Sequence, residues 1–133
     1  MERERGTKYM NTPTTVQPRR VRSFKDLIVW EQAMDLAVEI YRFTEALPAD
    51  ERYGLTAQMR RAAVSAPSNI AEGQARGYRA DYRHSLCIAL GSLAELETQL
   101  ILCQRLKLVS SVEALCAGSE RIRVMLLRLI KTL

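Results

Sequence analysis

The side chains that most often ligate metals are few and scattered in this sequence. His84 is the single histidine, and the three cysteines, Cys87, Cys103 and Cys116, form no CxxC pair. A zinc site needs several such ligands at close spacing, and a di-iron bundle needs two Glu-x-x-His motifs, which one histidine cannot supply. The sequence therefore predicts no metal site and no cofactor.

Carboxylates are the next candidate catalytic groups, because a pair of carboxylates can act as general acid and general base. Glu72, Glu95 and Glu97 can converge between neighbouring helices, but no nucleophile or base partner stands out beside them. The sequence also lacks the Gly-rich phosphate loops and the GxSxG pattern that accompany nucleotide or acyl chemistry. We therefore expect no catalytic residues and no enzyme activity.

Arginines are the chemical groups that remain, and they bind phosphates. The formal net charge is +5, and most of it lies in residues 1–22, so the rest of the chain is nearly neutral. Four arginines are expected to flank the turn between the second and third helices, and three more end the N-terminal segment. The candidate nucleic-acid contacts are therefore Arg60, Arg76, Arg79, Arg83, Arg19, Arg20 and Arg22.

The elements that position these groups are predicted from apolar periodicity. Residues 1–22 contain two prolines and no apolar periodicity, which predicts a disordered basic tail. The tail either increases solubility or binds RNA or another acidic partner. Residues 23–133 are expected to form one domain of four helices, at about 23–46, 50–74, 80–106 and 111–132. The third helix carries an a/d seam that alternates steps of three and four: Tyr82, Leu86, Ala89, Leu93, Leu96, Leu100 and Cys103.

These helices predict an all-α fold, an antiparallel up-down-up-down four-helix bundle. The aromatic fraction is only 6%, which favours helices over sheets. No uninterrupted apolar run reaches the roughly 18 residues of a membrane span, so we expect no membrane partner. An odd number of cysteines without a CxxC pair favours reduced, buried thiols and a cytoplasmic location.

The first helix has a wider apolar arc than one bundle core requires. One row runs through Trp30, Met34 and Tyr41, and a second, through Ala33 and Ile40, lies beside it. A helix with two apolar rows is buried on two sides. The second side is predicted to meet a neighbouring subunit, which makes the protein a homo-oligomer.

The stretch "RRAAVSAPSNIAEG" is the most unusual part of the second helix. Its small residues predict a close approach to the third helix, and Pro67 predicts a kink packed against Gly91. A polar network is expected to support this kink, with Arg61 as a partly buried partner of Glu72 or Glu95. The predicted members are Arg61, Asn69, Glu72, Ser92 and Glu95. Alternatively, or in addition, the kink displays Arg60, Asn69 and Arg76 on a binding surface.

Three stretches resemble a known family: "FKDLIVWEQAMDL", "YGLTAQMRRAAVSAPSNIAEG" and "HSLCIALGSLAELETQL". Together they are similar to the 23S ribosomal RNA intervening-sequence protein family, also called the four-helix bundle protein family, over about residues 24–133. The resemblance implies a barrel-shaped homopentamer of four-helix bundles, whose genes often lie inside insertions in bacterial 23S rRNA genes. It also implies a relation to the accessory variability protein of diversity-generating retroelements, a similar pentamer that binds nucleic acid and a reverse transcriptase.

Two functions follow as expectations. The first is a pentameric scaffold that binds RNA or DNA mainly through phosphates, with little sequence preference, because base-stacking aromatics are scarce. The second is a protein-interaction scaffold with no physiological nucleic-acid binding, which the near-neutral charge of residues 23–133 favours.

Overall fold

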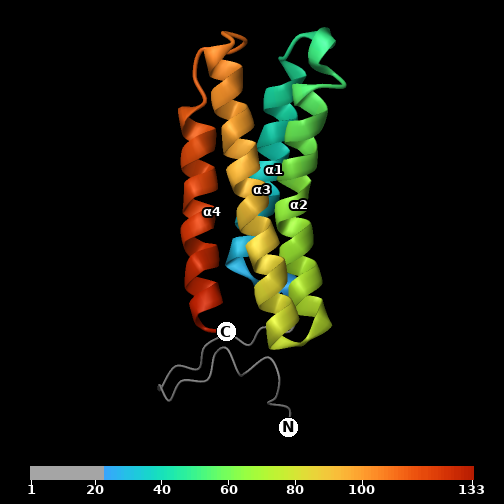
Figure 1. The fold of residues 1–133 in the computed structure, drawn as a ribbon, viewed down its shortest axis with the longest axis vertical. Helices are drawn as coiled ribbons and strands as arrows, with labels where there is room; N and C mark the ends of the chain where they lie inside the picture. The colour runs from blue at the N-terminus through green and yellow to red at the C-terminus, as the bar shows by residue number, and fades with distance from the viewer. Residues whose placement is uncertain (1–22) are drawn as a thin grey trace.

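The structure is a computed structural model that describes residues 23–133. These residues form a bundle of four α-helices. They are α1 (Ile28–Glu45), α2 (Leu55–Arg76), α3 (Arg79–Arg105) and α4 (Glu113–Lys131), with two short 3-10 helices, η2 (Phe24–Asp26) and η3 (Ala49–Glu51). The four helices run alternately up and down, and the described residues form no strand (Figure 1). The predicted all-α, up-down-up-down bundle is confirmed.

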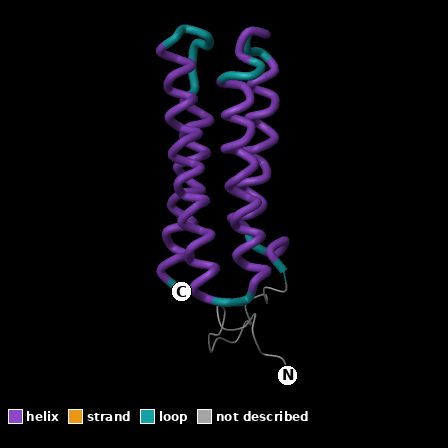
Figure 2. Tube along the Cα trace, turned by 45° about the vertical axis from the view of Figure 1, so that its right-hand side comes forward, coloured by secondary structure: helices purple, strands orange, loops and turns teal. Residues whose placement is uncertain are grey.

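Each helix packs against two of the other three. Helix α2 contacts α1 and α3, and α4 contacts the same two helices from the opposite side. Among the described residues the diagonal pairs, α1 with α3 and α2 with α4, bring no Cα atoms within 8 Å of each other, so the four helices lie at the corners of a square. The α2–α3 interface is the most extensive, and Figure 2 shows that the α2–α3 turn joins the two halves at one end.

The helix ends differ in detail from the predicted ones. Ser23 and Asp26 form a capping box, but it caps η2, and α1 begins five residues after Ser23, at Ile28. Helix α2 begins only at Leu55, because η3 and a turn intervene after Pro48. Gly77 ends α2 in the left-handed conformation, with φ at +81°, where a residue with a side chain would be strained.

The bundle core contains every residue of the seam predicted on α3, all of them buried. Helix α4 buries Ile122 and Leu126 in the same core, and Ser119, which precedes Ile122 by one turn and is only 1% exposed, also faces it. By length and composition alone α3 is apolar enough to cross a membrane, and 44% of that stretch is buried in the bundle. This is weak evidence for a membrane span, because the core helix of a water-soluble bundle passes the same test.

The close approach of α2 to α3 occurs at Gly73 and not at Gly91. A Cβ atom added to Gly73 would lie 2.7 Å from the Cβ of Ser85, whereas one added to Gly91 would meet nothing within 4 Å. Gly91 is exposed, because it lies midway between Ala89 and Leu93 on the side of α3 opposite the buried seam. The predicted contact at Gly91 is therefore wrong.

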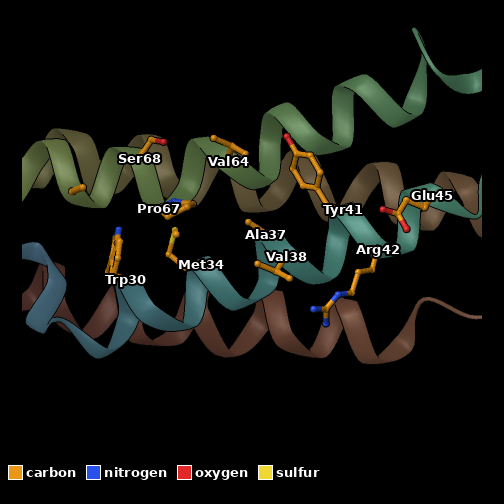
Figure 3. A pocket seen from close by; sticks show the side chains of 11 residues that line it. Trp30, Met34, Ala37, Val38, Tyr41, Arg42, Glu45, Val64, Pro67 and Ser68 are labelled. Atoms are coloured by element: carbon orange, nitrogen blue, oxygen red, sulfur yellow. The ribbon is translucent and has the colours of Figure 1, made fainter.

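Pro67 lies inside a continuous α2 and is buried on the side that faces α1. Figure 3 shows Pro67 on the side of α2 that faces α1. Pro67 therefore lies beside α1, whereas the sequence had predicted a bend packed against α3.

Candidate functional site

The α2–α3 turn carries three of the predicted arginines at one end of the bundle (Figure 1). Arg76, Arg79 and Arg83 are all exposed. Arg76 donates to Glu72 at 2.9 Å, and both side chains of this pair are about half exposed. An exposed pair at this spacing contributes only about 0.3–0.5 kcal/mol, so a phosphate can compete with Glu72 for the guanidinium.

Tyr78 lies between Arg76 and Arg79, and sequence reasoning missed it. Its side chain is 71% exposed, its backbone is extended, and it precedes the first turn of α3 without a side-chain capping bond. The stretch "RGYR" was the available signal, because an aromatic residue directly after a helix-ending glycine falls outside both helical faces. The turn is therefore cationic and aromatic at once.

Charge is distributed unevenly between the two ends of the bundle. At the end with the α2–α3 turn there are four acids, Asp26, Glu31, Glu72 and Asp81, and six cations, Lys25, Arg76, Arg79, Arg83, Arg128 and Lys131. At the opposite end the four acids Glu45, Asp50, Glu51 and Glu113 are balanced by the four cations Arg42, Arg52, Arg105 and Lys107. We call the first the basic end; its field attracts polyanions, and that of the other end does not.

Arg60 does not belong to the basic end, contrary to its predicted place beside the turn. It precedes Arg76 on α2 by about four turns, roughly 24 Å. Its Nε donates to Thr44 Oγ1 at 2.8 Å and its Nη2 to the Tyr41 carbonyl at 3.3 Å. The guanidinium also lies 4.5 Å from the centroid of the Tyr41 ring. Arg60 therefore ties α2 to α1. Arg19, Arg20 and Arg22 lie outside the described residues.

A small polar network joins α2 to α3. The hydroxyls of Ser65 and Ser92 lie 2.7 Å apart, and Asn69 Nδ2 donates to the Ser65 carbonyl at 2.9 Å and to its hydroxyl at 3.1 Å. Ser92 also donates to the Ile88 carbonyl. The structure thus brings Asn69 and Ser92 together through Ser65, a residue that was not predicted to belong to the network.

The other predicted members of this network lie elsewhere. Arg61 is exposed rather than partly buried, and Glu72 pairs with Arg76. Glu95 is exposed and accepts a long hydrogen bond, 3.4 Å, from Gln99. The prediction that Arg61 is a partly buried partner of Glu72 or Glu95 is wrong, because residue 61 falls on the outer face of α2.

A groove of about 680 Å³ runs between α1 and α2 and is lined by α1 from Trp30 to Glu45 and by α2 from Val64 to Ala71. We call it the α1/α2 groove. Its lining is mostly apolar: Met34, Val38 and Val64 are each about 40% exposed there. Figure 3 shows Trp30 and Met34 extending from α1 toward α2. These are the side chains of the extra apolar row predicted on the first helix.

All three cysteines are free, and the prediction that they are buried is wrong for Cys87, which is exposed on the outer side of α3. Burial raises the pKa of the Cys103 and Cys116 thiols, and so keeps them protonated and poorly nucleophilic. His84 is exposed, and residues 23–133 contain no group of three or more His, Cys, Asp or Glu side chains that could hold a metal.

Comparisons with known proteins agree with this picture of the fold. No protein with a curated description matches the chain. A crystal structure from Bacteroides thetaiotaomicron, of a protein with unknown function from the S23 ribosomal protein family, shares 28% sequence identity. The match covers 78% of this chain and 99% of that one, with a TM-score of 0.72. The family model named "23S rRNA-intervening sequence protein" matches residues 25–128. The chain therefore belongs to the 23S rRNA-intervening sequence protein family.

Proposed function

We propose that this protein is a non-enzymatic homo-oligomeric scaffold that binds RNA or DNA through the basic end of its bundle. The observation that carries the proposal is the grouping of Arg76, Arg79 and Arg83, all exposed, at the end where cations outnumber acids. Arginine guanidinium groups bind phosphates, and phosphate contacts supply most non-specific affinity for nucleic acid. A role on nucleic acid implies a cytoplasmic location, and that reducing compartment suits a chain whose three cysteines are all free.

Self-association is part of the proposal, and the α1/α2 groove is its interface. Exposed aliphatic side chains on both walls, such as Val38 and Val64, gain from burial against a second copy. The resemblance to the family implies five copies. A ring would repeat a modest basic end once in each subunit, and several weak contacts on one strand would add up through avidity.

The nucleic-acid test replaces Arg76, Arg79 and Arg83 with alanine together and measures binding to RNA at two salt concentrations. The plot of log affinity against log salt should flatten by about 0.7–0.9 for each phosphate that the variant no longer neutralises. The matched control removes three exposed arginines away from both the basic end and the groove, Arg52, Arg61 and Arg105, and should change the slope far less. Deleting residues 1–22 separately measures what Arg19, Arg20 and Arg22 add.

The interface test replaces Val38 with lysine, which places a charge on the groove wall. Light scattering should show a smaller particle while the helical circular-dichroism signal is retained, because Val38 is not in the core. Leu127→Lys on α4 is the control, since Leu127 is similarly exposed but does not line the groove. A wild-type protein that is monomeric at micromolar concentration would contradict the homo-oligomer.

The alternative is a protein-interaction scaffold with no physiological nucleic-acid binding. The observation that favours it is the α1/α2 groove, whose apolar lining suits a helix of another protein as well as a second copy. Unchanged RNA affinity and salt slope in both the triple-alanine and the tail-deleted proteins, with the oligomer intact, would make this alternative the better description.

A further inference from the structure

We propose that the basic end binds single-stranded nucleic acid in preference to duplex, and that Tyr78 is the surface on which an unpaired base stacks. This inference rests on the proposed function and adds a ligand class and a recognition residue to it. The observation behind it is an exposed tyrosine flanked in sequence by Arg76 and Arg79 at the α2–α3 turn.

The Tyr78 ring takes no part in the described fold. Its side chain is 71% exposed, and within residues 23–133 it has no aromatic, cation–π or hydrogen-bond partner. Two other tyrosines of the bundle behave differently: Tyr82 is buried, and Tyr41 lies against the Arg60 guanidinium. A ring without such contacts keeps its surface free, and an aromatic face free on the surface can stack on a nucleobase.

The neighbouring arginines supply the phosphate contacts that a stacked base requires. Arg79 and Arg83 are one turn apart on α3, a spacing that brings side chains within roughly 6 Å of each other. Arg76 approaches from the other side of the turn, held only by its exposed pair with Glu72. If two successive phosphates of a strand bind to the arginines on either side of the turn, the base between those phosphates lies beside the Tyr78 ring. Base-stacking tyrosines and tracking arginines are the two components of single-strand binding surfaces.

Duplex nucleic acid cannot use this arrangement equally well. Its bases are stacked and paired inside the helix, and exposing one costs a few kcal/mol of unstacking and unpairing. A single strand offers the same phosphates and an already accessible base. Preference for the single strand therefore measures the contribution of Tyr78, whereas salt dependence measures that of the arginines.

The chain provides a matched control in Tyr53. This residue is 88% exposed and follows Arg52, but it lies at the opposite end of the bundle beside Asp50 and Glu51. An aromatic ring in an acidic surrounding does not meet phosphates. Tyr53→Ala removes an equally exposed ring without touching the basic end.

The experiment measures fluorescence anisotropy of a labelled 20-nucleotide oligouridine and of a 20-base-pair RNA duplex, titrated with full-length protein. Tyr78→Ala should weaken oligouridine binding by about 5- to 150-fold, the range expected when one stacked base is removed, without changing the salt slope. Tyr78→Phe should retain the affinity, because its ring still stacks, and Tyr53→Ala should change nothing. The duplex should bind more weakly than oligouridine and be insensitive to Tyr78→Ala.

Two different failures can be told apart. The stacking inference is overturned if oligouridine and duplex bind with equal affinity, or if Tyr78→Ala and Tyr53→Ala have the same effect on oligouridine binding. The proposed function still stands in either case, provided that the triple-alanine variant of Arg76, Arg79 and Arg83 no longer binds RNA. If neither oligonucleotide binds wild-type protein even at low salt, the proposed function fails and this inference fails with it.

Discussion

Helix α2 meets its two neighbours in opposite ways, although the same run of small residues faces both. Toward α3 the backbones come so close that Gly73 has no room for a Cβ atom, and Ser65 touches Ser92. Toward α1 the same helix leaves a groove of about 680 Å³. Small residues on one helix are therefore not enough to produce a close contact.

The difference lies in the facing helices. Helix α3 presents small residues to α2, among them Ser85 and Ser92, so the two surfaces fit at short range. Helix α1 presents Trp30, Met34 and Tyr41, whose bulk keeps α2 at a distance. Close packing needs complementary shapes on both sides, and a mismatch leaves surface for another molecule to cover.

The largest expected effect comes from adding one methyl group at each of two glycines. Gly73→Ala should destabilise the bundle by about 1–3 kcal/mol, because the new Cβ collides with Ser85 and outweighs alanine's helical preference. Gly91→Ala should instead stabilise it by up to about 1 kcal/mol, because nothing lies near that position. Urea denaturation of both variants checks the signs. A Gly73→Ala protein as stable as Gly91→Ala would mean that the α2–α3 interface is not tightly closed.

A second, smaller effect tests what holds α2 to α1 beside the groove. Arg60→Ala should cost about 1–2 kcal/mol, because it removes the hydrogen bond to Thr44 and the contact with the Tyr41 ring. Arg61→Ala should stay within about 0.5 kcal/mol, because Arg61 is exposed. Thermal unfolding of the two variants measures both changes. If Arg61→Ala destabilises the protein more than Arg60→Ala does, then Arg61 and not Arg60 is the arginine that packs against α1.

The smallest effect compares two serines of α2 that face different surroundings. Ser65→Ala should cost about 0.5–1.5 kcal/mol, since it removes the hydroxyl that joins Ser92 and Asn69. Ser68→Ala, on the groove side, should be neutral or stabilising by a few tenths of a kcal/mol, because alanine prefers the helix. Equal denaturation midpoints for the two proteins would show that the serine network contributes nothing to the α2–α3 interface.

The sequence by itself determined the four helices, the α3 seam from Tyr82 to Cys103 and the two apolar rows of α1. These features follow from periodicity within one helix, which is a local property. The burial pattern confirms the α3 seam and the row through Ala33 and Ile40, whereas Met34 and Tyr41 of the other row are about 40% exposed. The α3 seam also predicts that Gly91 is exposed, because Gly91 lies midway between Ala89 and Leu93 and therefore on the opposite face of the helix.

Only the tertiary structure decided which small residue makes the close contact, which of two adjacent arginines is packed and which aromatic ring stays free. Gly73, Arg60 and Tyr78 differ from Gly91, Arg61 and Tyr82 through what the neighbouring helix or turn places beside them. Periodicity fixes the faces of each helix separately. The rotation and separation of two helices depend on all the side chains between them, and those come from parts of the chain far apart in sequence.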